Sequence, residues 1–197
     1  FEELVSTLKK REILKTYSYL DSYLVLLDGT GYHASKTISC EKCLTREYTK
    51  DIITYHHQAI TPIIASPNLK RVIPLMPELI ENSDGTDKQD CEINTSKRWL
   101  KRDIALDLPI ILLGDDLYSR EPFCKDTLQS GKSFIFVAKE ESHKVAYEHI
   151  KFLDNLNELE SHQESQGRAY KQELWKYKFV NEIPINSNSD ALRANWV

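Results

Sequence analysis

A short, unbroken apolar run ends in an acid and a turn in the segment Tyr23-Leu24-Val25-Leu26-Leu27-Asp28-Gly29-Thr30. An apolar run of this length, bounded by turn residues, is typical of a strand that is covered on both faces of a sheet. Asp28 therefore stands at the carboxyl end of a buried strand. In open sheets these ends border a crevice, and chemistry collects there.

Two more apolar runs predict buried strands farther along the chain. Residues 110–114 form the first run, which follows Pro109 and is followed directly by Asp115 and Asp116. Residues 133–137 form the second. Because side chains alternate along a strand, Asp115 lies in phase with Ile111 and Leu113, whereas Asp116 points to the other face. A second acid is thus expected at the carboxyl end of a buried strand.

The remaining pattern predicts helices and antiparallel strands around these three strands. A rough 3.6-residue period over residues 2–20 predicts a leading helix, and the β-branched residues of 52–79 predict two or three antiparallel strands that extend the sheet. Residues 31–50 are polar and indicate a loop or small knuckle. Helices are expected after the turn at 82–85, with an apolar stripe of Ile93, Leu100 and Ile104, and between Ser119 and Gly131. The alternating segment 174–180 predicts a half-solvated strand.

Composition limits the classes of protein to which the chain could belong. The 197 residues suit one globular domain with a small addition, and 41% apolar with 28% charged residues argues against disorder or coiled coil. No apolar run approaches the roughly 20 residues of a membrane helix, so no membrane partner is expected. Four sparse cysteines favour a reducing cytoplasm. The net charge of −4 means that a nucleic-acid partner must be held by local basic residues.

Asp28 and Asp115 are the candidate metal ligands. If their strands are neighbours, the two carboxylates could share divalent cations, since hard oxygen ligands suit magnesium or manganese. Two such ions about 4 Å apart hold both the attacking and the leaving oxygen in phosphoryl transfer. Asp116 is the fallback ligand. The alternative is that all three acids are ordinary turn residues at strand ends.

Other residues form weaker constellations. Cys40 and Cys43 form a Cys-x-x-Cys pair, and with His56 they have the residue types that bind zinc. A reduced knuckle or a buried thiol pair is the alternative. Two groups of basic residues are candidates for contact with DNA phosphates, although most charge runs are merely solvated; they are Lys97 and Arg98, and Lys139 and Lys144.

Several segments together resemble the central part of bacterial insertion-sequence transposases that have a DDE catalytic triad. The resemblance covers nearly the whole chain from about residue 20. It is carried by Leu27-Asp28-Gly29-Thr30, Ile38-Ser39-Cys40-Glu41-Lys42-Cys43, Tyr55-His56-His57-Gln58-Ala59-Ile60-Thr61-Pro62, Lys88-Gln89-Asp90-Cys91-Glu92, Lys97-Arg98-Trp99-Leu100, Leu112-Leu113-Gly114-Asp115-Asp116-Leu117-Tyr118-Ser119 and Ala191-Leu192-Arg193-Ala194-Asn195-Trp196.

This resemblance implies an α/β, ribonuclease H-like fold: a mixed sheet with flanking helices and part of an inserted β-rich subdomain. The expected division is the end of an N-terminal helical region at 1–20, the catalytic core at 21–146 and the truncated insertion at 147–197. It also implies a transposase that cuts and joins DNA with two Mg²⁺ or Mn²⁺ ions held by Asp28 and Asp115, and that forms a homo-oligomer when full length.

The third member of such a triad is a Glu on a later helix, which this sequence does not match. Because the chain begins at Phe1 and ends at Val197 in an apolar stretch, we expect a piece of a longer protein. That piece would be inactive as a nuclease on its own. The rival interpretation is a transposase remnant that acts as a zinc-stabilised DNA- or protein-binding module. A metal-dependent nuclease unrelated to transposition is the third.

Overall fold

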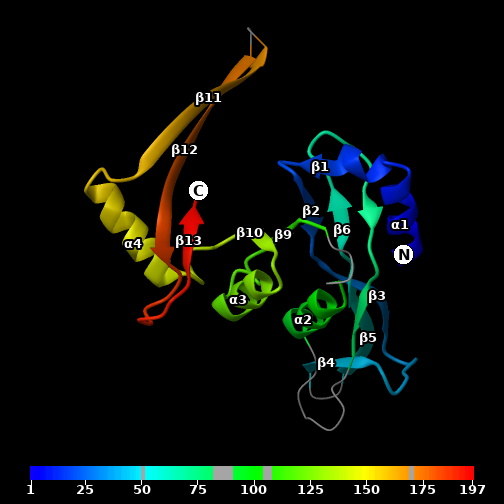
Figure 1. Cartoon of the computed structure of the whole chain (residues 1–197). Coiled ribbons are helices and arrows are strands. Elements are labelled where there is room, and N and C mark those ends of the chain that lie inside the picture. The colour runs from blue at the N-terminus through cyan, green and yellow to red at the C-terminus, as the bar shows by residue number, and fades with distance from the viewer. Residues whose placement is uncertain (50–51, 82–90, 104–107, 169–170) are drawn as a thin grey trace. The chain divides into compact units, whose positions relative to one another are not determined.

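The chain forms two compact units, which are described separately (Figure 1). The structure is a computed structural model, and it describes residues 1–49, 52–81, 91–103, 108–168 and 171–197. Unit 1 comprises Phe1–Val137, and unit 2 comprises Ala138–Val197. The sequence placed this boundary after Ala146, which lies inside a helix of unit 2. The change in amino-acid composition near residue 139 lies closer to the boundary between the two units than Ala146 does, so this change marks the division better.

Within the described residues, unit 1 contains most of the strands and three of the four α-helices. Its elements are α1 (Glu2–Lys10), a 3-10 helix (Ile13–Tyr17), β1 (Ser18–Tyr19), β2 (Ser22–Leu26), β3 (Gly29–Ser35), β4 (Leu44–Thr49), β5 (Ile52–Ile60), β6 (Ile63–Ala65), β7 (Ile73–Pro74), β8 (Glu78–Ile80), α2 (Glu92–Asp103), β9 (Ile110–Gly114), α3 (Glu121–Gln129) and β10 (Ser133–Phe136). Unit 2 consists of α4 (Lys144–Asn155), β11 (Glu160–Arg168), β12 (Lys171–Pro184) and β13 (Arg193–Trp196).

The central sheet of unit 1 has the strand order β10-β9-β2-β6-β7, with β1 paired to β2. Strands β2, β9 and β10 are parallel to one another. On the other side of β2, β6 is antiparallel to β2, and β7 pairs antiparallel with β6 and so runs in the same direction as β2. The three strands expected from the apolar runs are therefore present and adjacent, and the α/β class is confirmed. The expected burial was wrong for β10, which lies at the edge of the sheet with Ser133 and Ile135 exposed and with Phe134 and Phe136 half-buried. Strand β7 lies at the edge, where the missing N–H of Pro74 is tolerated.

A second sheet begins with β3, which follows β2 in the chain. Strand β5 pairs antiparallel with β3, β4 and β8. The N–H of Thr61, between β5 and β6, donates to the carbonyl oxygen of Asp28, between β2 and β3, at 3.0 Å. Asp28 is thus fixed at the junction of the two sheets. The prediction of a loop over residues 31–50 was wrong for β3 and β4, which are held by pairing with β5 rather than by their own apolar pattern.

One apolar core joins the helices of unit 1 to its central sheet. Val25 of β2, Leu112 of β9 and Phe123 of α3 are fully buried in it. Full burial of such side chains contributes about 1.5–3 kcal/mol each. Trp99 of α2 is also buried, and its indole N–H donates to the Met76 carbonyl at 3.0 Å. The core therefore anchors α2 against the sheet, which fixes the position of the first residue of α2.

The predicted helices are present in this core, but the leading helix is shorter than the expected 2–20: α1 ends at Lys10, a 3-10 helix follows, and residues 18–19 form β1. The expected stripe of α2 packs there through Ile93 and Leu100, whereas Ile104 lies outside the described residues. Helix α3 starts at Glu121, one residue after its N-cap Arg120 rather than directly after Ser119. It ends before Gly131, whose positive φ of 71° suits glycine. None of the described helices is long and apolar enough to cross a membrane.

Unit 2 packs a helix against a long antiparallel hairpin. Ala146 and Ile150 of α4 are buried together with Ile183 of β12, and Trp196 of β13 packs against this cluster. Strands β11 and β12 pair from Glu160 with Phe179 onward. The strand expected at residues 174–180 is therefore confirmed, and it belongs to the longer β12.

Candidate functional site

The parallel pairing of β2 and β9 brings the two predicted aspartates to the same edge of the sheet. Leu26 of β2 is in register with Leu113 of β9, and the N–H of Leu27 donates to the Leu113 carbonyl at 2.9 Å. Asp28 and Asp115 each lie two residues beyond this register pair. Because neighbouring strands are about 4.8 Å apart, the two acids occupy equivalent positions on adjacent strand ends. Both are exposed to solvent.

Glu92 adds a third carboxylate to these two. It is the first residue of α2 and is half-buried. Burial raises the pKa of the Glu92 carboxyl above its usual value, and the negative charges of Asp28 and Asp115 raise it further. Like charges interact in this way only when they are close. We call Asp28, Glu92 and Asp115 the carboxylate site.

Sequence reasoning missed Glu92 as a site residue. It lies in the segment Lys88-Gln89-Asp90-Cys91-Glu92, which was among those that carry the resemblance, but no strand end or helix face pointed to it. The signal that could have found it is its place at the start of the predicted helix after the 82–85 turn. A helix that begins beside a sheet edge presents its first side chain to that edge.

Gly29 makes room for the Glu92 carboxyl. A Cβ atom built at Gly29 would lie 2.3 Å from both Cδ and Oε1 of Glu92, far inside van der Waals contact. Gly29 follows Asp28 directly, so the absence of a side chain lets the Glu92 carboxyl approach the backbone beside Asp28.

Gly29→Ala is therefore expected to keep the fold and displace the Glu92 carboxyl, because the clashing atoms belong to a movable side chain. We expect the affinity for Mn²⁺ at the carboxylate site to fall by about 10-fold or more, as changes next to metal ligands commonly do. Titration followed by isothermal calorimetry measures this. Gly31→Ala is the matched control in the same strand, because its Cβ would meet only Gln58 Cγ at 3.9 Å. Equal affinities for both variants would contradict this role of Gly29.

A tight turn holds the Asp115 side chain. Its Oδ1 accepts a hydrogen bond from the N–H of Leu117 at 2.9 Å, and its carbonyl accepts one from the N–H of Tyr118 at 3.1 Å. This turn orients the carboxyl group and leaves Oδ2 for a ligand.

Burial raises the pKa of Tyr118 to about 12; the Ser96 side chain lowers this pKa, and the charges of Glu92, Asp115 and Asp28 add to the rise. Tyr118 is therefore a neutral neighbour of the three acids.

The same interactions separate Asp115 from Asp116. The aspartates that act on Glu92 and Tyr118 are Asp28 and Asp115. Asp116 is half-buried, and its carbonyl accepts a hydrogen bond from the Ser119 hydroxyl at 2.7 Å. The fallback assignment of a metal to Asp116 has no such geometric support.

Cys40 and Cys43 lie in a second cluster, which includes His57 rather than the expected His56. Among the described residues, Cys40, Cys43 and His57 are the one group of three ligand side chains whose atoms all lie within 4.8 Å of one another. They could hold a metal ion such as zinc. His56 was the wrong histidine because successive residues of β5 face opposite sides, and it lines a hollow of about 340 Å³ together with Thr54 and Gln58.

The carboxylate site is more open than this cluster. Its oxygens are not gathered within 4.8 Å as those ligand atoms are.

The basic residues predicted to contact DNA in unit 1 are engaged in ion pairs. Lys97 Nζ lies 2.9 Å from Asp126 Oδ2, and Arg98 Nε lies 3.3 Å from Glu78 Oε1. These pairs link α2 to α3 and to β8, which favours a structural role. Contact of Lys97 and Arg98 with DNA stays a prediction.

The basic residues predicted for unit 2 lie around the start of α4. Lys144 is the first residue of α4 and is exposed. Lys139 is exposed and accepts hydrogen bonds at its carbonyl from the N–H groups of Ser142 and His143. Contact of Lys139 and Lys144 with DNA also stays a prediction.

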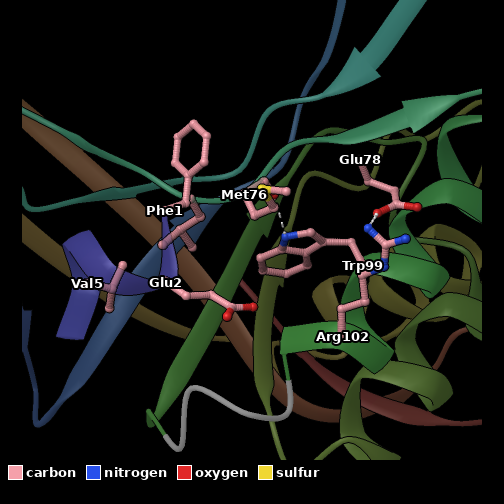
Figure 2. A pocket seen from close by; sticks show the side chains of 8 residues that line it. Phe1, Glu2, Val5, Met76, Glu78, Trp99 and Arg102 are labelled. Atoms are coloured by element: carbon pink, nitrogen blue, oxygen red, sulfur yellow. Dashed lines mark hydrogen bonds and ion pairs between the residues drawn. The ribbon is translucent and has the colours of Figure 1, made fainter.

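A further hollow of unit 1 does not belong to the carboxylate site (Figure 2). Its volume is about 290 Å³. Figure 2 shows the Trp99 indole donating to the Met76 backbone and Arg102 beside Glu78, where Nη1 lies 2.7 Å from Oε2. None of the three acids is among its lining residues, which are Phe1, Glu2, Val5, Leu75, Met76, Glu78, Trp99 and Arg102.

Comparison with family models finds no match to this chain, and comparison with curated protein sequences finds none either.

Proposed function

We propose that this chain is the catalytic part of an insertion-sequence DDE transposase, which cleaves and joins DNA phosphodiesters at the carboxylate site. The observation that carries the proposal is the meeting of Asp28, Asp115 and Glu92 beside the carboxyl ends of two adjacent parallel strands. Turn acids without a shared task have no reason to be gathered where they repel one another.

The topology of unit 1 supports a ribonuclease H-like fold. In its central sheet, β2, β7, β9 and β10 run in one direction and β6 runs in the opposite direction. Helix α2 lies between β8 and β9 in the chain, and α3 lies between β9 and β10. The candidate acids follow β2 and β9, the two central parallel strands, which is where the resemblance put the first two catalytic residues.

The donor set fits divalent magnesium or manganese. Carboxylate oxygens are the ligands that these hard cations prefer. Burial and the charges of Asp28 and Asp115 raise the pKa of Glu92, and a bound cation would offset this repulsion. Two bound ions would supply a lowered pKa for the attacking water or 3′ hydroxyl and charge neutralisation at the phosphorus. Asp28 and Asp115 would bind these ions from the two strand ends, and Glu92 from the helix.

The protein groups around the acids limit their movement. The backbone of Asp28 is fixed by Thr61, and the carboxyl of Asp115 is fixed by the N–H of Leu117. Preorganised ligands need no rearrangement when substrate binds, and this is the main contribution of a protein to such chemistry. The acids are open to solvent on the outer side, so a DNA phosphate could reach them.

Cleavage of plasmid DNA tests this proposal. The expectation that this piece is inactive rested on the lack of a Glu on a later helix; Glu92 is not that residue, because α2 precedes Asp115 in the chain, but it supplies a third carboxylate beside the two aspartates. We therefore expect the chain to nick supercoiled plasmid in Mn²⁺, more weakly in Mg²⁺ and not in excess EDTA, as followed on agarose gels. Nicking that persists in EDTA, or no nicking in either metal, would contradict the proposal.

The wider properties of the enzyme are part of the same proposal. Its DNA partners would be transposon ends and target DNA, with a homo-oligomer as the full-length form and the cytoplasm as the compartment. The candidates for holding the DNA backbone are Lys97 and Arg98 of α2, Lys144 of α4 and Lys139, which precedes α4.

A second candidate function is a non-catalytic module stabilised by zinc that binds DNA or a protein. The cluster of Cys40, Cys43 and His57 is the observation that favours it. This candidate predicts DNA binding without metal-dependent nicking, so the plasmid assay separates the two.

A further inference from the structure

We propose that Cys40, Cys43 and His57 form a zinc site that clips the segment before β4 onto β5. This site is separate from the carboxylate site and does not depend on the proposed function. Cys43 is buried, Cys40 is exposed and His57 is half-buried. The cluster therefore lies at the surface, where an ion can enter and one side remains open to solvent.

The distances between the ligand atoms match tetrahedral zinc. The two sulfurs are 3.6 Å apart, and His57 Nε2 lies 3.3 Å from Cys40 Sγ and 3.4 Å from Cys43 Sγ. With Zn–S bonds of about 2.3 Å and a Zn–N bond of about 2.05 Å, tetrahedral angles give about 3.8 Å between sulfurs and about 3.6 Å between sulfur and nitrogen. A zinc ion thus fits among the three atoms with shifts of a few tenths of an ångström.

Backbone hydrogen bonds hold the sulfurs of Cys40 and Cys43 close together, where a cation could bind both. The N–H of Cys40 donates to Cys43 Sγ at 3.2 Å, and the N–H of Cys43 donates to the Cys40 carbonyl at 3.1 Å. This turn points both side chains to one spot. Cys40 and Cys43 do not form a disulfide with each other, because 3.6 Å between their sulfurs is far beyond the roughly 2.05 Å of a disulfide bond.

The ligand types select the metal. Thiolate and imidazole suit zinc, whereas Mg²⁺ and Mn²⁺ prefer the oxygens of the carboxylate site. Zinc binding would release the two thiol protons to solvent, so the affinity should fall as the pH is lowered. The fourth coordination position lies outside this set of three side chains.

The position of the cluster assigns it a structural role. The cysteines belong to the segment between β3 and β4, and His57 lies in β5, to which both strands pair. Three residues farther along β5, Ile60 is in register with Gly29, next to Asp28. A zinc ion would therefore hold together the sheet that supports one side of the carboxylate site, at about 10 Å along the strand.

Metal analysis and cobalt spectroscopy of the intact chain test the inference. We expect one zinc per chain by mass spectrometry after purification, and with Co²⁺ the intense visible bands of tetrahedral coordination together with a thiolate-to-cobalt charge-transfer band. Cys40→Ser and His57→Ala should each lower the zinc affinity by more than about 100-fold, because even outer partners of a metal ligand change the affinity by 10–100-fold.

Two matched variants serve as controls. His56→Ala removes the neighbouring imidazole on the other face of β5, and Cys91→Ser removes an exposed thiol outside the cluster. Both should keep one zinc per chain and an unchanged cobalt spectrum. A cobalt spectrum without thiolate charge transfer would overturn the inference. Zinc lost in His56→Ala but kept in His57→Ala would overturn it as well.

The outcome is independent of catalysis. Removal of zinc with a zinc-selective chelator should lower the melting temperature, and excess Mg²⁺ should not restore it. An unchanged melting temperature after complete removal would contradict the structural role. Plasmid nicking tests the carboxylate site alone, so either proposal can fail while the other stands.

Discussion

Asp28→Asn and Asp115→Asn should each lower metal-dependent nicking by about 10³-fold or more while the chain stays folded. Each substitution replaces a charged oxygen ligand with a neutral amide at the end of a central strand. Metal ions contribute several kcal/mol of transition-state stabilisation, and about 1.4 kcal/mol changes the rate tenfold. Initial nicking rates in Mn²⁺, with circular dichroism to confirm folding, measure the effect.

Asp116→Asn is the control for this pair of variants. It removes the same negative charge from the next residue, which is not one of the two aspartates that raise the pKa of Glu92. Its nicking rate should stay within a few fold of that of the unaltered chain. A variant at Asp28 or Asp115 that retains most of the activity, or an Asp116 variant that loses it, would show that the ligands are wrongly assigned.

Glu92→Gln should lower nicking by about 100-fold and also stabilise the metal-free chain. The loss of activity follows from the removal of the third carboxylate ligand. The gain in stability follows because the charged form of Glu92 is disfavoured by burial and by Asp28 and Asp115. Solvent screens a half-buried group, so the gain is at most about 1 kcal/mol, or about 2–4 °C in melting temperature for a chain of this size.

The pH dependence of this gain has a definite sign. The folded-state pKa of Glu92 is raised above its usual 4.5, so folding favours its protonated form. Below pH 4.5 Glu92 carries no penalty, and the unaltered and Gln chains should melt alike. As the pH rises through the folded-state pKa, the unaltered chain loses stability and the difference grows to its full size. Melting curves from pH 4 to 8 without metal measure it.

Addition of Mn²⁺ provides the control for Glu92. A cation between the carboxylates removes their repulsion, so the advantage of the Gln variant should shrink or reverse when Mn²⁺ is present. A Gln variant that is less stable at every pH without metal would contradict the described electrostatics. A Gln variant with full nicking activity would exclude Glu92 as a ligand.

Much of the fold follows from local sequence patterns because the central strands are short, apolar and bounded by turns. Strands β2, β9 and β10 were predictable for this reason, and so were the acids after β2 and β9. Strands β3 and β4 were not, because Thr30, His33 and Arg46 give them a polar pattern and their stability comes from pairing with β5.

Only part of the candidate site could be predicted from the sequence. Adjacent strands share an edge, so Asp28 and Asp115 could be expected to meet once their strands were assumed to be neighbours. Glu92 is the first residue of α2, and the position of α2 depends on the packing of Trp99 in the core. No local sequence pattern encodes that packing. The choice between His56 and His57 depended on which face of β5 meets the cysteines, which is a matter of register.

Anomalous diffraction from crystals of this chain soaked in Mn²⁺ tests the central claim most directly. The account predicts two manganese peaks about 4 Å apart, within coordination distance of Asp28 and Asp115 and with Glu92 on one of them. Peaks elsewhere, with none at the two strand ends, would contradict it.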